Sequence, residues 1–256
     1  MTAERMPSAT GANDNSAPRR AIIVAIDGPA GAGKSTVARH LAQYFGLLNL
    51  ESGAMYRAFA LKALSAGLNL EDSVALVELS THTSITLVPS PEGNHVLLDG
   101  LDVTEQLRDP QVTDGASRVS VHPPIRVWMV GLQQKLGASG GVVMEGRDIG
   151  TVVFPHADVK IFLDAAPEVR GLRRYDQMGQ MGQTEATSEI QPEAVVQEMR
   201  ARDQRDRNRA DSPLKPAADA VLLDSTHLTL DQVVAQAEAI VIEKLGASIL
   251  TPAEPQ

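Results

Sequence analysis

The chain has 256 residues, 43% of them hydrophobic, which is enough for one large or two small domains with a substantial core. Its net charge of −9 opposes a general nucleic-acid-binding surface, because phosphate-backbone affinity comes from clustered Lys and Arg. Without cysteine there are no disulfides, thiol nucleophiles or thiolate metal ligands. No run has the length of a membrane span, and residues 1–20 lack a secretory apolar segment, so we expect a cytoplasmic protein with no membrane partner.

Residues 1–20, rich in Ala, Ser, Asn, Gly and Pro without periodicity, predict a disordered tail. An apolar run at 21–26 predicts a strand, and a helical pattern covers 36–45. Between them, residues 28–35 read Gly-Pro-Ala-Gly-Ala-Gly-Lys-Ser, a complete G-x-x-x-x-G-K-[ST] phosphate loop. Nucleotide binding is therefore the first hypothesis, and an ordinary glycine-rich turn is the alternative.

The chemistry of such a loop assigns roles to its residues. Backbone N–H groups turn inward around phosphate oxygens, and the following helix N-terminus adds a favourable dipole. Lys34 would reach the β- and γ-phosphates, and Ser35 would supply a hydroxyl to Mg²⁺, the expected cofactor. The predicted nucleotide-binding set is Gly28, Pro29, Ala30, Gly31, Ala32, Gly33, Lys34, Ser35 and Thr36.

The elements after the loop alternate between strands and helices. In chain order we expect a strand at 47–50, helices at 54–66 and 73–80, short strands at 84–88 and 95–98, helices at 110–119 and 124–136, strands at 141–144 and 159–164, a polar, mobile stretch at 177–188 flanked by helices, a strand at 219–223, a helix at 230–245 and a tail at 247–256. This pattern predicts an α/β fold with a mostly parallel five-stranded sheet flanked by helices, plus a small antiparallel sheet within 83–103.

Residues 200–209 contain five arginines in an acidic chain, and suggest a small anionic ligand. On a helix, Arg202, Arg205 and Arg209 would share one face, since they lie at i, i+3 and i+7. The alternative is a solvated surface on which Asp203 and Asp206 neutralise the arginines.

Three segments together are more specific than the phosphate loop, which GTPases, motor ATPases and kinases share. Residues 51–57 (Glu-Ser-Gly-Ala-Met-Tyr-Arg), 145–151 (Glu-Gly-Arg-Asp-Ile-Gly-Thr) and 202–209 (Arg-Asp-Gln-Arg-Asp-Arg-Asn-Arg) resemble those of bacterial cytidylate kinases, over about residues 21–245. The resemblance implies a P-loop NTPase fold and direct in-line transfer from ATP to CMP or dCMP. An acceptor phosphate is already ionised near neutral pH, so the reaction needs arginines that bind its oxygens and no general base.

The resemblance also implies a CMP site. Ser52, Arg57, Arg202 and Arg209 would bind the acceptor phosphate, Asp206 would help to hold the ribose, and Asp148 with Ser117 and Arg126 would read cytosine, which offers an amino donor beside two acceptors. The complete predicted set is Ser52, Arg57, Ser117, Arg126, Arg147, Asp148, Arg202, Asp206 and Arg209.

Arg170, Arg173 and Arg174 lie on one helical side just before the polar stretch, and predict a lid at 170–209 that closes over the nucleotides. The catalytic candidates are Lys34, Arg170, Arg173, Arg174 and Arg202. The expected core spans 21–69, 121–169 and 210–246, and the nucleoside monophosphate-binding insert spans 70–120.

Two alternatives stay open at this point. One is another small-molecule P-loop kinase, acting on UMP, shikimate or gluconate, and the other is a nucleotide-sensing module without turnover. Glu51 and Glu145 also stand where relatives of the family usually have a shorter residue, most often Asp. We expect a monomer whose partners are small nucleotides.

Overall fold

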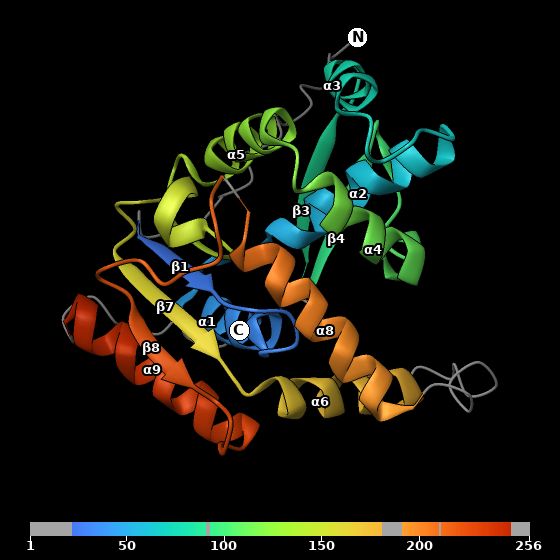
Figure 1. The fold of residues 1–256 in the computed structure, drawn as a ribbon. Helices are drawn as coiled ribbons and strands as arrows, with labels where there is room; N and C mark the ends of the chain where they lie inside the picture. The colour runs from blue at the N-terminus through green and yellow to red at the C-terminus, as the bar shows by residue number, and fades with distance from the viewer. Residues whose placement is uncertain (1–21, 91–92, 181–190, 210, 247–256) are drawn as a thin grey trace, which may run out of the picture.

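The central sheet has five parallel strands in the order β2-β6-β1-β7-β8 (Figure 1). The computed structural model describes residues 22–90, 93–180, 191–209 and 211–246, so the predicted tails and residues 181–188 of the polar stretch lie outside the described residues. The predicted parallel sheet is confirmed. Its strands are β1 (Ile23–Asp27), β2 (Leu48–Glu51), β6 (Val142–Gly146), β7 (Val159–Asp164) and β8 (Val221–Asp224).

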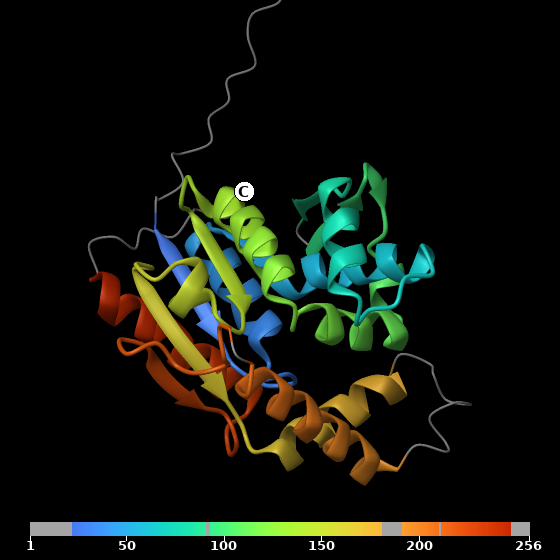
Figure 2. The same cartoon turned by 45° about the horizontal axis from the view of Figure 1, so that its top comes forward.

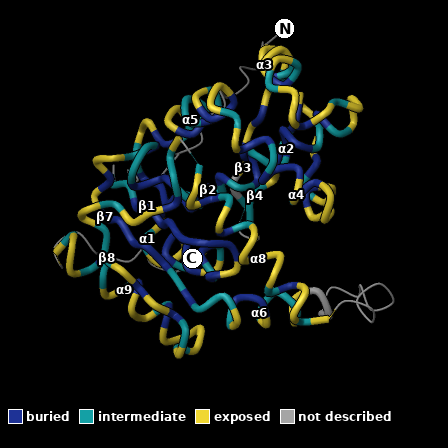
Figure 3. The backbone as a smooth tube through the Cα atoms, in the orientation of Figure 1, coloured by how far each residue is buried: buried dark blue, intermediate teal, exposed yellow. Residues whose placement is uncertain are grey.

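Both faces of this sheet are buried, which explains why its strands read as continuous apolar runs. In β1, Val24 and Ile26 join one core cluster and Ala25 joins the other, because successive strand side chains point to opposite faces. The first face is covered by α1 (Lys34–Phe45) and α9 (Leu230–Leu245), and the second by α2 (Ser52–Ser65) and α5 (Pro123–Gly137). Figure 3 shows buried strands inside partly exposed helices.

A smaller antiparallel sheet, β3-β4-β5, lies beyond α2, as the alternating segments predict. Its strands are β3 (Ile85–Ser90), β4 (Gly93–Leu98) and β5 (Leu101–Asp102), accompanied by α3 (Ser73–Thr81), the 3₁₀ turn η1 (Gln106–Arg108) and α4 (Pro110–Val119). Asp72 and Asp109 begin α3 and α4 by accepting backbone N–H groups of the first turn. The buried apolar residues of this region belong to the same core cluster as α2, α5 and the second face of the main sheet.

The helices α6 (Pro167–Gln180) and α8 (Pro192–Arg207) lie side by side and project from the core beyond the carboxyl ends of the strands (Figures 1 and 2). The helices approach closely at Gly171, where a Cβ would lie 2.3 Å from Val196 Cγ2. The helical backbone of α6 continues to Gln180, so the predicted loop start at residue 177 is wrong. The polar residues of this turn carry little apolar periodicity, so the local sequence pattern alone does not predict the continued helix. Within the described residues, no helix combines the length and apolar character that a membrane crossing requires.

Candidate active site

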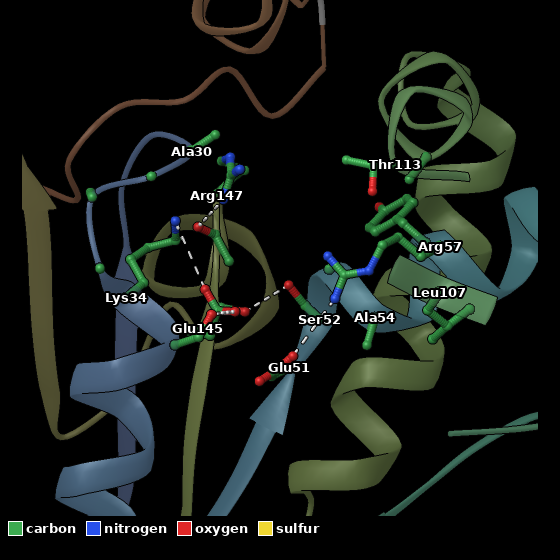
Figure 4. A pocket seen from close by; sticks show the side chains of 18 of the residues that line it. Ala30, Lys34, Glu51, Ser52, Ala54, Arg57, Leu107, Thr113, Glu145 and Arg147 are labelled. Atoms are coloured by element: carbon green, nitrogen blue, oxygen red, sulfur yellow. Dashed lines mark hydrogen bonds and ion pairs between the residues drawn. The ribbon is translucent and has the colours of Figure 1, made fainter. Parts of the chain in front are cut away.

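A cavity of about 1010 Å³ opens at the carboxyl ends of β1, β2 and β6. Ligand loops of parallel α/β sheets lie at this edge, because every strand ends there. The phosphate loop and α1 form one side, and α2, α4 and η1 form the other. Figure 4 shows Lys34 and Arg57 pointing into the cavity from opposite sides, with Glu145 and Ser52 between them. Sequence segments separated by more than a hundred positions therefore face one space.

The backbone of the phosphate loop requires glycine at two positions where other elements approach. Gly28 has φ of 149°, and a Cβ there would lie 1.9 Å from the carbonyl oxygen of Leu163 on β7. Gly31 has φ of 74°, and its Cβ would lie 2.5 Å from Met199 Cε on α8. A side chain at position 28 would force the loop away from β7, whereas at position 31 the Met199 side chain can shift and the left-handed backbone is what favours glycine.

Lys34, the first residue of α1, is buried below the loop. Its Nζ donates to the Pro29 carbonyl oxygen at 2.8 Å and lies 3.8 Å from Glu145 Oε2. Burial lowers the Lys34 pKa to about 7, assisted by the positive charge of Arg147 and opposed by Glu145. An anionic phosphate at this position would favour the charged ammonium form.

Ser35 and two carboxylates form an oxygen-rich group beside Lys34. Ser35 Oγ donates to Glu145 Oε1 at 2.9 Å, and Glu51 lies in register with Glu145 on the neighbouring strand. Burial and the charge of Glu145 raise the Glu51 pKa, and Arg57, 3.7 Å from Glu51 Oε2, opposes the shift. Ser52 Oγ donates to the Glu145 backbone carbonyl at 2.7 Å. Hard oxygen donors of this kind fit Mg²⁺, which keeps several waters and phosphate ligands in such sites.

The residues predicted to read cytosine are brought together in the structure. Arg126 and Asp148 form a buried ion pair, and Arg126 Nη1 also donates to the Ser120 carbonyl oxygen at 3.2 Å. Ser117 Oγ and Arg126 Nε are buried without a hydrogen-bond partner among the described residues. Buried polar atoms without partners are costly, so these two are candidates for ligand contacts.

Arg147, Arg202 and Arg209 lie around Asp206, and Arg209 also lies near Arg126. Arg147 Nε contacts Asp206 Oδ2 at 3.0 Å, and Arg209 Nη1 lies 4.0 Å from Asp206 Oδ1. Arg202 Nε and Arg209 Nη2 are buried and unpartnered within the described part of the chain. Burial, together with Arg147, lowers the Arg202 pKa to about 10, so its guanidinium stays charged at neutral pH.

This burial contradicts the solvated-surface interpretation of residues 200–209, because Asp203 and Asp206 are only 7% and 5% exposed. The predicted arginine stripe needs a correction, however. Arg205 points toward Asp114 on α4, 3.5 Å away at the surface, and α8 ends at Arg207, before Arg209. Regular helical spacing therefore does not describe the last of these arginines.

The three predicted lid arginines have different environments. Arg170 is 1% exposed and donates to the carbonyl oxygens of Ala165 and Ala30, at 2.7 and 2.9 Å, and to the Asp203 carboxylate. Arg170 is therefore not part of the cavity lining, in contrast to its predicted place facing the phosphates, because Nε, Nη1 and Nη2 all donate to groups of the protein. Arg173 and Arg174 line the cavity, and Arg173 donates to Ser225 Oγ and its carbonyl oxygen at 3.1 and 2.8 Å.

Two cavity-lining or supporting groups were missed by sequence reasoning. Tyr56 lines the cavity, and burial raises its pKa to about 12; its place inside the 51–57 segment was the available signal. Asp203 holds Arg170, and no local pattern distinguishes it from a surface aspartate.

A phosphate loop facing an arginine-lined acceptor end defines this protein as a P-loop phosphotransferase of small molecules. The family model for cytidylate kinase matches residues 24–243. The chain therefore belongs to the cytidylate kinase family.

Curated relatives agree with this assignment. A cytidylate kinase from Desulforamulus reducens is 49% identical, over 82% of this chain and 92% of its own length. Another, from Syntrophotalea carbinolica, is 44% identical over 88% and 94% of the two chains, and one from Geobacillus kaustophilus is 45% identical over 89% and 100%. The family-model match includes the phosphate loop, residues 70–120 and the α6–α8 region.

Proposed function

We propose that this protein transfers the γ-phosphoryl group of ATP to CMP and dCMP, forming CDP and dCDP. The observation that carries the proposal is a group of buried cavity-lining atoms that have no hydrogen-bond partner among the described residues: Ser117 Oγ, Arg126 Nε, Arg202 Nε and Arg209 Nη2. Ser117 Oγ and Arg126 Nε suit the polar edge of a base, and the guanidinium atoms of Arg202 and Arg209 suit phosphate oxygens.

On the donor side, the backbone of residues 28–36 would hold the ATP phosphates and Lys34 would neutralise the β- and γ-phosphates. Ser35 would ligate Mg²⁺, and Glu145, whose carboxylate already accepts from Ser35, would orient a metal-bound water. When bound, Mg²⁺ supplies positive charge to the phosphates. The protein residues position that charge.

On the acceptor side, Arg57, Arg147, Arg202 and Arg209, together with Ser52, would bind the CMP phosphate, and Asp206 would orient the ribose and the arginines around it. The acceptor oxygen is ionised near neutral pH, so the reaction requires alignment and charge neutralisation and no general base. Arg173 and Arg174, on the cavity wall, would approach the transferring group when α6 and α8 close.

Base selection would depend on Asp148, Arg126 and Ser117. The Asp148 carboxylate would accept from the cytosine amine, whereas UMP presents a carbonyl at that position. Two acceptors would then face each other in a buried site, which disfavours UMP by several kcal/mol. The insert at 70–120, the lid at 170–209, the monomeric state and the cytoplasmic location stay predictions.

The direct test is ADP release from Mg²⁺·ATP with CMP, dCMP, UMP, AMP, GMP or shikimate offered one at a time. Selective turnover of CMP and dCMP would support the proposal. Preference for another acceptor would keep a P-loop kinase but remove Ser117, Arg126 and Asp148 as base readers. ATP binding without turnover of any acceptor would favour the sensing module.

A further inference from the structure

The backbone turn after Asp148 is held by a carboxylate from another strand. This π-helical turn is η2 (Ile149–Val153), and Asp148 occupies its N-cap position with φ of −147°. The first N–H groups of a helical turn have no partner inside it, and the N-cap side chain commonly accepts one. The Asp148 side chain does not cap its own turn, because its carboxylate contacts Arg126.

Asp27 supplies the missing acceptors. Its Oδ1 accepts the N–H of Ile149 and its Oδ2 accepts the N–H of Gly150, each at 2.7 Å, across 122 and 123 sequence positions. Asp27 is 4% exposed and is the last residue of β1, so the phosphate loop starts at the next residue. One carboxylate thus joins the start of the phosphate loop to the backbone beside Asp148.

Two backbone N–H donors favour the ionised form of the buried Asp27 carboxylate. Burial raises the pKa of the Asp27 carboxyl to about 6, and the negative charge of Asp148 adds to this increase. The N–H groups of Gly150 and Ile149 and the positive charge of Lys34 act in the opposite direction. Both oxygens of an ionised carboxylate are acceptors, which suits two backbone donors. An amide in the same place would turn its own N–H toward one of these donors.

We propose that Asp27 is a positioning residue that caps the turn after β6 in place of Asp148, so that the Asp148 carboxylate is available to the acceptor base. The inference rests on the proposed function. It assigns part of the base preference to the last residue of β1, whose carboxylate orients the backbone that follows Asp148.

The test compares Asp27→Asn with wild type by steady-state kinetics for CMP, UMP and Mg²⁺·ATP. We expect the ratio of kcat/KM for CMP to that for UMP to fall about tenfold, mainly through a higher CMP KM, with the Mg²⁺·ATP KM changed less than about threefold. An unchanged ratio would overturn the inference. Equal losses for all three substrates would also overturn it, since they indicate only a general structural role.

Asp72→Asn is the matched control. Asp72 also accepts two backbone N–H groups, from Val74 and Ala75 at 3.0 and 3.1 Å, at the exposed start of α3. The Asp72→Asn variant loses the same charge by the same atomic change as Asp27→Asn. The preference of this control for CMP over UMP should equal that of wild type. A wild-type protein that does not turn over CMP would refute the proposed function itself. A CMP-selective wild type with an equally selective Asp27→Asn refutes only the inference.

A second measurement covers the case in which Asp27→Asn does not fold. In wild type, hydrogen exchange at the Ile149 and Gly150 amides should slow when CMP binds and slow less with UMP at equal saturation. Equal protection by the two nucleotides, or none, would overturn the positioning role.

Discussion

Binding of Mg²⁺·ATP should transfer a proton from solvent to Lys34 at alkaline pH. Burial lowers the Lys34 pKa to about 7, and the phosphates of ATP would restore the charged form. With that pKa, about one tenth of the lysine is protonated at pH 8, so binding should take up about 0.9 proton per ATP. At pH 6 about nine tenths is already protonated, and the uptake falls to about 0.1. The ATP affinity should therefore decrease as pH rises above 7.

Isothermal titration calorimetry at pH 8 in several buffers measures this uptake. The number of protons is the slope of the observed binding enthalpy plotted against the ionisation enthalpy of the buffer. At that pH, Asp27, with a pKa of about 6, stays ionised and Arg202, with a pKa of about 10, stays protonated, so neither adds to the slope. Lys34→Arg keeps a permanent charge and should reduce the slope to near zero. A wild-type slope near zero, or an equal slope in Lys34→Arg, would refute the reasoning.

Three further predictions concern the acceptor site and α6. In Asp148→Ala, the fold increase in the CMP KM should exceed the fold increase in the Mg²⁺·ATP KM by at least about tenfold, because Arg126 loses its buried partner. Equal increases in the two KM values would contradict base reading. Arg209→Met should lower kcat/KM for CMP at least about tenfold, and near-normal kinetics would remove it from the phosphate site. Arg170→Met should lower the free energy of unfolding in urea by about 3–5 kcal/mol, because Asp203 stays buried and unpaired; wild-type stability would contradict this.

The local part of the site was predictable from sequence. The glycines, Lys34 and Ser35 of the phosphate loop lie within eight consecutive positions, so the sequence alone identifies them and their roles. Strand and helix periodicity likewise reports burial that is repeated along one element, and it located the parallel sheet and the small antiparallel sheet. Resemblance to the family added the acceptor residues, which the structure brings to one cavity.

Only the tertiary structure decided which predicted arginines face that cavity. Spacing along a helix establishes that Arg170 and Arg174 share a side, but not what lies opposite, and Arg170 is bound by a phosphate-loop carbonyl and by α8. Arg205 likewise contacts Asp114 of another helix. The cap by Asp27 joins groups 122 positions apart, and no local pattern reports such a pair. Sequence spacing determines the direction of a side chain relative to its own element, whereas its partner depends on how the elements pack.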